Sequence, residues 1–254
     1  MRLRLPFVIP LEVWDLPVAG RLLQGWRSDP TFDVRLAAVA RSIREAPPPT
    51  FSARARAAAI EIAHVHLVGG GATDATSAAI AEHGGLSCSR STEPFAPARA
   101  GSTLRPDALC VDVGQTAIKL VHRDREWRVE RDRSLAPMRD EVPHDQRASA
   151  RASTVRFLGA LLASTHSAAR IVLALPCELD EADVPRSCTY CWRDPDPDLV
   201  PELARIARRS IEIVNDAELA AVAATAHGLV PRDRTILVLT VGFGVGAALL
   251  LPRP

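Results

Sequence analysis

The segment D-V-G-Q-T-A-I-K, from Asp112 to Lys119, combines residue types that suit the binding of a phosphate group. It continues an apolar run that predicts a buried strand, and a return strand is expected after the turn. Gly114 allows the backbone to approach closely, so that N–H groups of the turn can bind an anion. Asp112 suits a water-mediated hold on Mg²⁺, and Thr116 supplies a hydroxyl. An ordinary β-hairpin is the alternative interpretation.

Lys119 is the only lysine in the 254 residues, and every other basic residue is arginine. Where a guanidinium would serve, this sequence uses arginine. A single retained lysine therefore indicates a site that needs a compact ammonium group rather than a planar fork. A compositional accident is the alternative.

Two further glycine-rich turns follow apolar runs. Thr240 to Gly246, T-V-G-F-G-V-G, has three alternating glycines that could wrap a phosphate. His66 to Ala72, H-L-V-G-G-G-A, has three consecutive glycines, against which a flat ligand could lie. Each could also be a plain tight turn, since glycine marks those as well.

An Asn215-Asp216 pair stands between an apolar run and a stretch of small residues, in I-E-I-V-N-D-A-E-L-A-A-V-A-A. This pattern predicts a buried strand followed at once by a helix. Asp216 would then lie at a helix N-terminus, where the helix dipole favours a carboxylate. The pair could catalyse a reaction, or it could simply cap the helix and so stabilise it by about 1 kcal/mol.

Composition narrows the classes of partner. The formal net charge of +1 gives no electrostatic argument for binding nucleic acid or an acidic membrane surface, and we expect neither partner. No apolar run approaches the length of a membrane span. The odd number of cysteines favours a reducing cytoplasm over a disulfide framework. Cys188 and Cys191 form a lone C-x-x-C, for which we weigh a zinc or redox role against a purely structural one.

Strand-like and helical segments alternate along the chain, which predicts an α/β fold. The expected strands include residues 2–9, 65–68, 109–113, 117–122, 171–175, 211–214 and two strands within 235–251. Residues 33–45, 51–63, 74–83, 154–165, 199–208 and 217–226 predict helices. Residues 124–148 are rich in charge and predict an exposed loop.

Taken together, these motifs resemble those of the actin/hexokinase superfamily, and most closely those of the ROK sugar kinases. In that resemblance, Asp112 to Lys119 is similar to the first phosphate motif, Thr240 to Gly246 to the second, and Gly69 to Ala72 to the adenosine motif. V-N-D-A-E-L-A-A-V-A-A is similar to the segment that bears the catalytic aspartate. The resemblance implies Asp216 as catalytic base, Asn215 as substrate ligand and Asp112 as Mg²⁺ ligand. The implied phosphate ligands are Gly114, Gln115, Thr116, Lys119, Gly242, Gly244 and Gly246, and the implied adenosine ligands are Gly69, Gly70, Gly71 and Ala72.

The order of the motifs differs from that of the family. The adenosine-like motif precedes the first phosphate motif here, although the cyclic order is intact. We therefore expect a circularly permuted, two-lobed ribonuclease-H-like fold of the actin-like ATPase type, with a central nucleotide cleft. Residues 104–232 should form one lobe, and residues 1–100 with 235–254 the other.

The resemblance implies an ATP-dependent kinase that uses Mg²⁺ and phosphorylates a hydroxyl of a small polar substrate, with sugars as the leading class. The family's cysteine-rich zinc motif and its Gly-Glu-x-Gly-His sugar-binding segment have no match in the sequence. Phe243 stands where the family usually has a small threonine. A nucleotide-binding protein without kinase activity, which switches a protein partner, is the alternative. A homodimer is left open.

Overall fold

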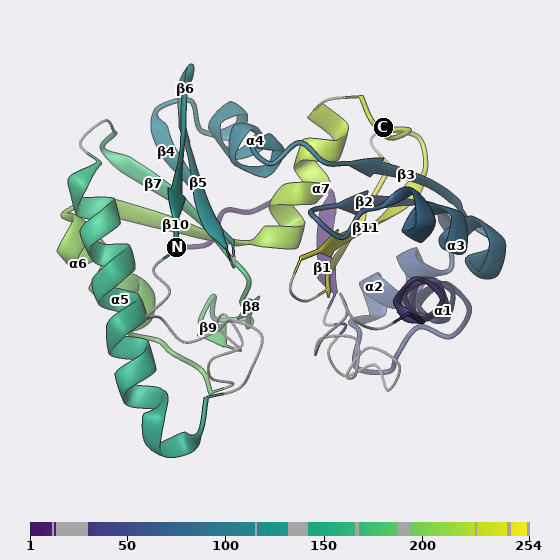
Figure 1. Ribbon diagram of the computed structural model, residues 1–254, viewed down its shortest axis with the longest axis horizontal. Helices are drawn as coiled ribbons and strands as arrows, with labels where there is room; N and C mark the ends of the chain where they lie inside the picture. Colours follow the sequence, from purple (N-terminus) through teal and green to yellow (C-terminus); the bar gives the residue numbers. More distant parts are fainter. Residues whose placement is uncertain are drawn as a thin grey trace. The chain divides into compact units, whose positions relative to one another are not determined.

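The computed structural model describes residues 1–11, 13, 30–114, 116–131, 142–165, 168–186, 194–226, 228–242 and 245–252. The fold is α/β, as the alternation of strand and helix patterns predicts (Figure 1). The strands are β1 (Val8–Leu11), β2 (Ile62–Val68), β3 (Ser87–Ser91), β4 (Ala108–Val113), β5 (Ala117–His122), β6 (Arg125–Glu130), β7 (Arg170–Leu175), β8 (Glu178–Leu179), β9 (Pro185–Arg186), β10 (Ser210–Asn215), β11 (Thr235–Val241) and β12 (Val245–Leu250). The helices are α1 (Phe32–Glu45), α2 (Ala53–Ala59), α3 (Asp74–Gly84), α4 (Ala96–Leu104), α5 (Arg147–Ser164), α6 (Leu199–Ala207) and α7 (Asp216–Ala226), with a short 3-10 helix, η2 (His144–Gln146).

The chain divides into two compact units. Unit 1 comprises Met1–Arg4 and Pro97–Leu219, and unit 2 comprises Leu5–Ala96 and Ala220–Pro254. The second division falls inside helix α7, so that its first turn belongs to unit 1. None of the described helices combines the length and the apolar character needed to cross a membrane.

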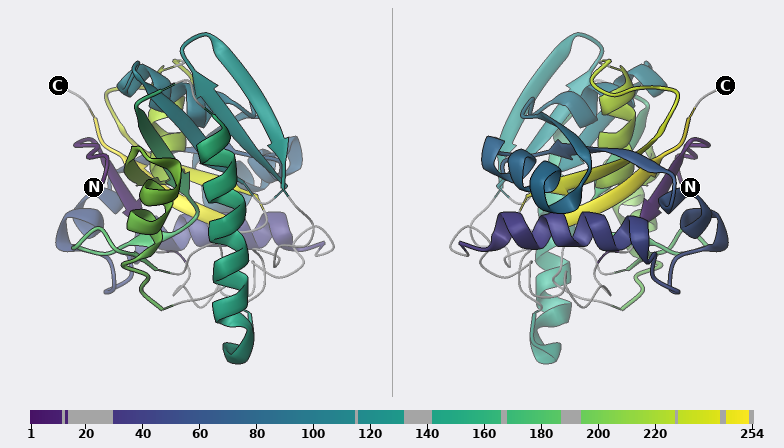
Figure 2. Two further views of the ribbon diagram at one scale, coloured as in Figure 1. Left: turned by 90° about the vertical axis from the view of Figure 1, so that its left-hand side faces the viewer. Right: turned by 90° about the vertical axis from the view of Figure 1, so that its right-hand side faces the viewer.

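Unit 1 is built on a five-stranded sheet in the order β10-β7-β4-β5-β6. Strands β10, β7 and β4 run parallel, while β5 and β6 continue the sheet as antiparallel hairpins. Helices α5 and α6 pack side by side, and their apolar residues join those of the strands in one core (Figure 2). Gly159 of α5 lies so close to Ile206 that an added Cβ would come within 2.9 Å of it, so a side chain there would separate the two helices.

Unit 2 is built on a sheet in the order β1-β12-β11-β2-β3. Strands β11, β2 and β3 are parallel, and β12 and β1 complete the sheet antiparallel to their neighbours. Helix α1 buries Leu36, Val39, Ala40 and Ile43, the i, i+3, i+4, i+7 spacing of an amphipathic helix. This stripe belongs to the core that also includes alternate residues of β2, β11 and β12.

The two sheets share one pattern: three parallel strands followed by two antiparallel ones. In unit 1 the chain passes through the antiparallel strands immediately after β4. In unit 2 it passes from β11 to β12, but the strand next to β12 is β1, near the beginning of the sequence. Val8 of β1 is paired with Leu250 of β12.

The structure corrects two of the element predictions. Residues 124–148 are not one exposed loop, because residues 125–130 form strand β6 at the edge of the unit 1 sheet and α5 begins at residue 147. Residues 2–9 are not one strand either: strand β1 of unit 2 begins at Val8, while Arg2, which belongs to unit 1, forms an isolated parallel bridge with Ile213 of the unit 1 sheet. Strand β6 was missed because an edge strand with many charged side chains lacks the clear apolar alternation that predicts a strand.

Candidate functional site

Three candidate residues of unit 1, Asp112, Asn215 and Asp216, lie at the carboxyl ends of the parallel strands β4 and β10. Strand β4 ends at Val113, β7 at Leu175 and β10 at Asn215, and in a parallel sheet these ends share one edge. Ligands of α/β proteins commonly bind at this edge. Asp112 and Asp216 therefore come from different segments to the same side of the sheet.

Asp112 and Lys119 form an ion pair across the β4–β5 hairpin. They are direct partners in its register, and Lys119 Nζ lies 3.1 Å from Asp112 Oδ2. Gly114, at the turn, is required by this arrangement, since a Cβ there would lie 2.9 Å from Lys119 Nζ and 2.8 Å from the carbonyl oxygen of Ala117. The hairpin thus holds one ammonium group next to one carboxylate, both largely withdrawn from water. Thr116 is exposed at the turn, and Gln115 lies outside the described residues.

Asp216 is the first residue of helix α7, directly after β10. The pKa of its carboxyl group is raised to about 7: burial is the largest cause and the negative charge of Asp112 the second, while the Ala217 backbone N–H and the Lys119 charge oppose the shift. The Asp216 residue as a whole is partly accessible to solvent. A carboxyl group with such a pKa can accept a proton near neutral pH, as a general base must.

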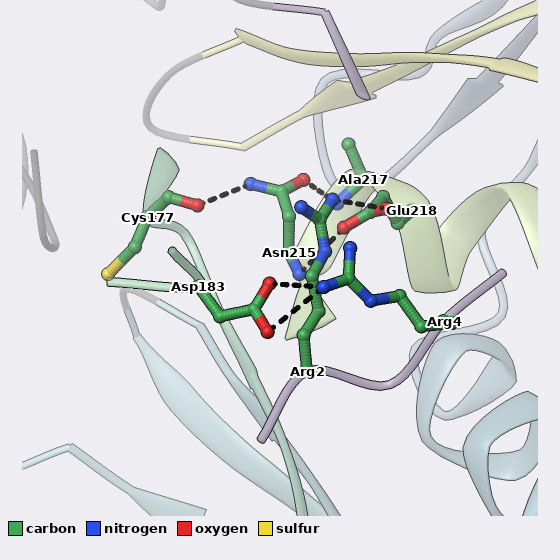
Figure 3. A network of polar contacts seen from close by, with 7 residues as sticks. All are labelled: Arg2, Arg4, Cys177, Asp183, Asn215, Ala217 and Glu218. Atoms are coloured by element: carbon green, nitrogen blue, oxygen red, sulfur yellow. Dashed lines mark hydrogen bonds and ion pairs between the residues drawn. The ribbon is translucent and has the colours of Figure 1, made fainter. Parts of the chain in front are cut away.

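Asn215 is engaged within unit 1 at both ends of its side chain. Its Nδ2 donates to the carbonyl oxygen of Cys177 at 2.8 Å, and its Oδ1 accepts from the N–H of Ala217 at 2.9 Å (Figure 3). The amide group has a second Nδ2 hydrogen that these two bonds do not use. Asn215 therefore connects the segment after β7 to the start of α7, and its binding of substrate stays a prediction.

In unit 2 the two glycine turns follow neighbouring parallel strands. Val68 of β2 is paired with Thr240 of β11, so both turns lie at the carboxyl edge of that sheet. The Gly71 N–H donates to the carbonyl oxygen of Val241 at 2.9 Å. Gly69 has a φ of +106°, and a Cβ there would lie 2.7 Å from the same oxygen, so only glycine fits this contact.

The remaining described glycines of these turns leave space beside the backbone. A Cβ added at Gly70 or Gly242 would meet no atom within 4 Å. Gly246 is in strand β12, where its N–H donates to Thr240 Oγ1 at 3.2 Å, and Ala72 is buried just before α3. Gly244 and Phe243 lie outside the described residues. The structure thus brings Gly69 to Ala72 beside Val241, as one glycine-rich edge.

A family model described as "ROK family" matches residues 108–252 of the chain, more than half of its length. The chain belongs to the ROK family. No curated protein and no solved structure matches it. The ROK family includes sugar kinases and also non-enzymatic repressors, so membership indicates a kinase only at a coarse level. The matched range contains Asp112, Lys119, Asp216 and Gly242 but not Gly69 to Ala72.

Within this ROK chain, sequence reasoning missed one residue beside Asp216. Glu218 Oε2 accepts the backbone N–H of Asn215 at 3.3 Å, which with the Asn215–Ala217 bond makes a reciprocal capping box. The spacing Asn215-x-x-Glu218 was the available signal. Glu218 also contacts Arg2, which lies 216 positions away, and no sequence spacing predicts that contact.

The cysteine motif does not enter this site. Cys188 and Cys191 lie outside the described residues, and Cys88 and Cys110 have free thiols. In the described part of the chain, no three side chains of His, Cys, Asp or Glu gather in a way that could hold a metal ion.

Proposed function

We propose that the protein is an ATP-dependent kinase that transfers the γ-phosphoryl group to a hydroxyl of a small polar molecule, with sugars as the first class to test. The observation that carries this proposal is the placement of Asp216. It combines a pKa of about 7, a position at a helix N-terminus and electrostatic proximity to the Asp112–Lys119 pair. Family membership supports the same reaction class.

In this proposal, Asp216 accepts the proton of the attacking hydroxyl while the hydroxyl oxygen forms its bond to the γ-phosphorus. The bond from that phosphorus to the β,γ-bridging oxygen breaks, and ADP leaves with the electron pair. Asn215 holds the turn that carries Asp216 and can offer its remaining N–H to the acceptor. Lys119 places positive charge near the transferring group, where the transition state needs it.

The chemistry of Asp112 fits Mg²⁺, which is ordinarily bound by one or two carboxylates together with waters and phosphate oxygens. Asp112 would hold the ion, through water, and the ion bound with ATP would offset the negative charge of the phosphates. Lys119 already neutralises part of the Asp112 charge. The residues present therefore accommodate a nucleotide that arrives with its metal.

Unit 2 would bind the nucleotide through its glycine-rich edge. Gly70 and Gly242 leave open backbone on which adenosine and phosphate groups could lie, and Gly69 fixes the contact between the two turns. Exclusion of water from the bound nucleotide would prevent hydrolysis of ATP without phosphorylation of the acceptor.

We also propose that the segment order is circularly permuted. The support is that unit 2 repeats the strand pattern of unit 1 only when its strands are read from β11 and β12 on to β1, β2 and β3. A variant in which residues 5–96 are moved behind residue 252 through flexible linkers should still unfold cooperatively and bind nucleotide. A variant that stays unfolded would count against this order.

A panel of sugars and polyols, incubated with the purified protein, Mg²⁺ and ATP, tests the proposed function. We expect at least one compound to be converted to its phosphate ester with equal amounts of ADP formed. ATP consumption that only produces inorganic phosphate, with no ester from any compound, would favour the alternative of a nucleotide-dependent switch.

A further inference from the structure

Residues 1–4 lie along the outer edge of the unit 1 sheet, next to strand β10. The N–H of Leu3 donates to the carbonyl oxygen of Ile213, and the N–H of Ile213 donates to that of Met1, both at 2.9 Å. These bonds extend the sheet by a short parallel segment. Ile213 lies two residues before Asn215, so the segment flanks the strand that leads into the candidate catalytic turn.

The segment places Arg2 against the capping box of helix α7. Arg2 Nη2 lies 2.9 Å from Glu218 Oε1 (Figure 3), and the two side chains are only 13% and 3% exposed. The other carboxylate oxygen of Glu218 accepts the backbone N–H of Asn215. One carboxylate therefore links Arg2 to the residue immediately before Asp216.

The charge of Arg2 matters because Glu218 is buried. A buried carboxylate without a partner is unfavourable, and removing one member of such a pair leaves the other uncompensated. Burial raises the pKa of Glu218, and Arg2 is the strongest influence in the opposite direction. A protonated Glu218 would be a weaker acceptor for the Asn215 N–H, so losing Arg2 would loosen the box.

We propose that Arg2 is a positioning residue for the phosphoryl transfer: it fixes the Glu218 carboxylate, which fixes the Asn215 backbone and so the direction of Asp216. This inference rests on the proposed function for its catalytic part only. The reacting hydroxyl and the base must be held in one geometry, and a small displacement caused by a remote residue can lower turnover substantially.

The neighbouring pair between Arg4 and Asp183 supplies a contrast. Arg4 Nη2 lies 3.0 Å from Asp183 Oδ1, but the Arg4 side chain is 70% exposed. Exposed ion pairs contribute little to stability because water and salt screen them. Arg4→Gln is therefore a matched control, because it removes a nearby arginine of the same short segment that forms no ion pair with Glu218 and whose charge is the weakest of the influences that lower the pKa of Glu218.

The test combines turnover with amide hydrogen exchange in the full chain. We expect Arg2→Met to lower kcat roughly 10- to 100-fold with little change in the KM for ATP. Exchange of the Asn215 and Ala217 amide hydrogens should become faster. Arg2→Lys should restore much of both, because the contact joins one guanidinium nitrogen to one carboxylate oxygen and an ammonium group can replace it. Arg4→Gln should behave like the unsubstituted protein.

A double-mutant cycle decides whether Arg2 acts through Glu218. In a Glu218→Gln background, Arg2→Met should cause little further loss of kcat. Additive losses, or unchanged kcat and exchange in Arg2→Met, would overturn the inference. If Arg2→Met does not fold, Glu218→Gln carries the test alone: it removes the same ion pair and should lower kcat and speed exchange of the Asn215 amide hydrogen, and an unchanged kcat and exchange rate would overturn the inference. If the unsubstituted protein transfers no phosphoryl group, the proposed function fails, but the positioning contact can still be tested. Unaltered amide exchange at Asn215 and Ala217 in Arg2→Met would then show that Arg2 does not fix the Asn215 backbone.

Discussion

The two units use the same sheet pattern but end it with different chemistry. At the carboxyl edge of unit 1 stand charged side chains: Asp112, Lys119 and Asp216. At the corresponding edge of unit 2 stand glycine turns, which offer backbone N–H groups and open space. The strands supply a common support in both units, and in the proposed function the residues at their carboxyl ends would carry out proton transfer in unit 1 and nucleotide binding in unit 2.

The two units also differ in how their buried titrating groups respond to pH. Asp216 of unit 1 has a raised pKa, so its contribution to stability is present at acid pH and is lost as the pH rises toward 7. His66 of unit 2 is fully buried, and burial lowers its pKa to about 4, with the charge of His64 as a second cause. Its contribution is present above about pH 6.5, the value for an unfolded chain, and is lost as the pH falls toward 4.

Replacing His66 should produce the largest change in this comparison. His66→Gln removes the buried imidazole, so the fall in the free energy of unfolding between pH 6.5 and 4 should shrink by on the order of 3 kcal/mol. Denaturant titrations at several pH values measure this slope. The control, His83→Gln, replaces an exposed histidine of the same unit and should leave it unchanged. An equal slope in His66→Gln and the unsubstituted protein would show that His66 is not held neutral by burial.

Two adjacent glycines of one unit 2 turn, Gly69 and Gly70, should differ sharply in their effect on stability when each is replaced by alanine. Gly69→Ala forces a side chain into a left-handed backbone and against the Val241 carbonyl oxygen, and should cost about 1–3 kcal/mol of unfolding free energy. Gly70→Ala meets nothing within 4 Å and should leave stability nearly unchanged. Chemical denaturation of both variants makes the comparison. Equal stabilities would mean that the contact between the two turns is not fixed by Gly69.

The sequence predicted those parts of the molecule whose signal is local. The hairpin that pairs Asp112 with Lys119 and the strand-to-helix step at Asn215 and Asp216 are marked by apolar runs and turn residues, and the structure confirms both. The ROK assignment came from the same motifs and is confirmed. The circular permutation and the binding roles of the glycines stay predictions.

What the sequence did not reveal depends on long-range pairing or on exposed backbone. Strand β6 carries charged residues at the sheet edge, so its pattern looks like that of a loop. Arg2 and Glu218 are 216 positions apart in the sequence, and no local sequence pattern predicts that they form an ion pair. The pKa of Asp216 likewise depends on burial and on a charge from another strand, which only the folded chain brings together.

Lys119 offers the next test of the charged edge of unit 1. Lys119→Arg keeps the positive charge, but the space beside Gly114 is tight and the guanidinium is wider than an ammonium group. We expect the KM for ATP to rise by about tenfold, or roughly 1.4 kcal/mol of binding free energy. Arg128→Lys is the control, since Arg128 is Lys119's partner in the register on β6 and is half exposed. Unchanged kinetics in Lys119→Arg would return the single lysine to a compositional accident.

The smallest effect expected is on the titration of Asp216. Asp112→Asn removes the negative charge that helps to raise the pKa of Asp216, so that pKa should fall, while Lys119→Met should raise it. Carbon NMR of the Asp216 carboxyl group in nucleotide-free protein follows both shifts without requiring activity. Shifts of the same sign in the two variants would contradict the electrostatic coupling described here.

The most direct test of the division between the two units measures turnover and nucleotide affinity in one variant of each. Asp216→Asn should lower phosphoryl transfer by roughly 10²-fold or more while the Kd for ATP with Mg²⁺, measured by calorimetry, stays nearly unchanged. Gly242→Ala, whose added methyl group meets no protein atom within 4 Å, should keep its stability but weaken nucleotide binding. The account would be contradicted if Asp216→Asn kept its turnover, or if Gly242→Ala bound ATP as tightly as the unsubstituted protein.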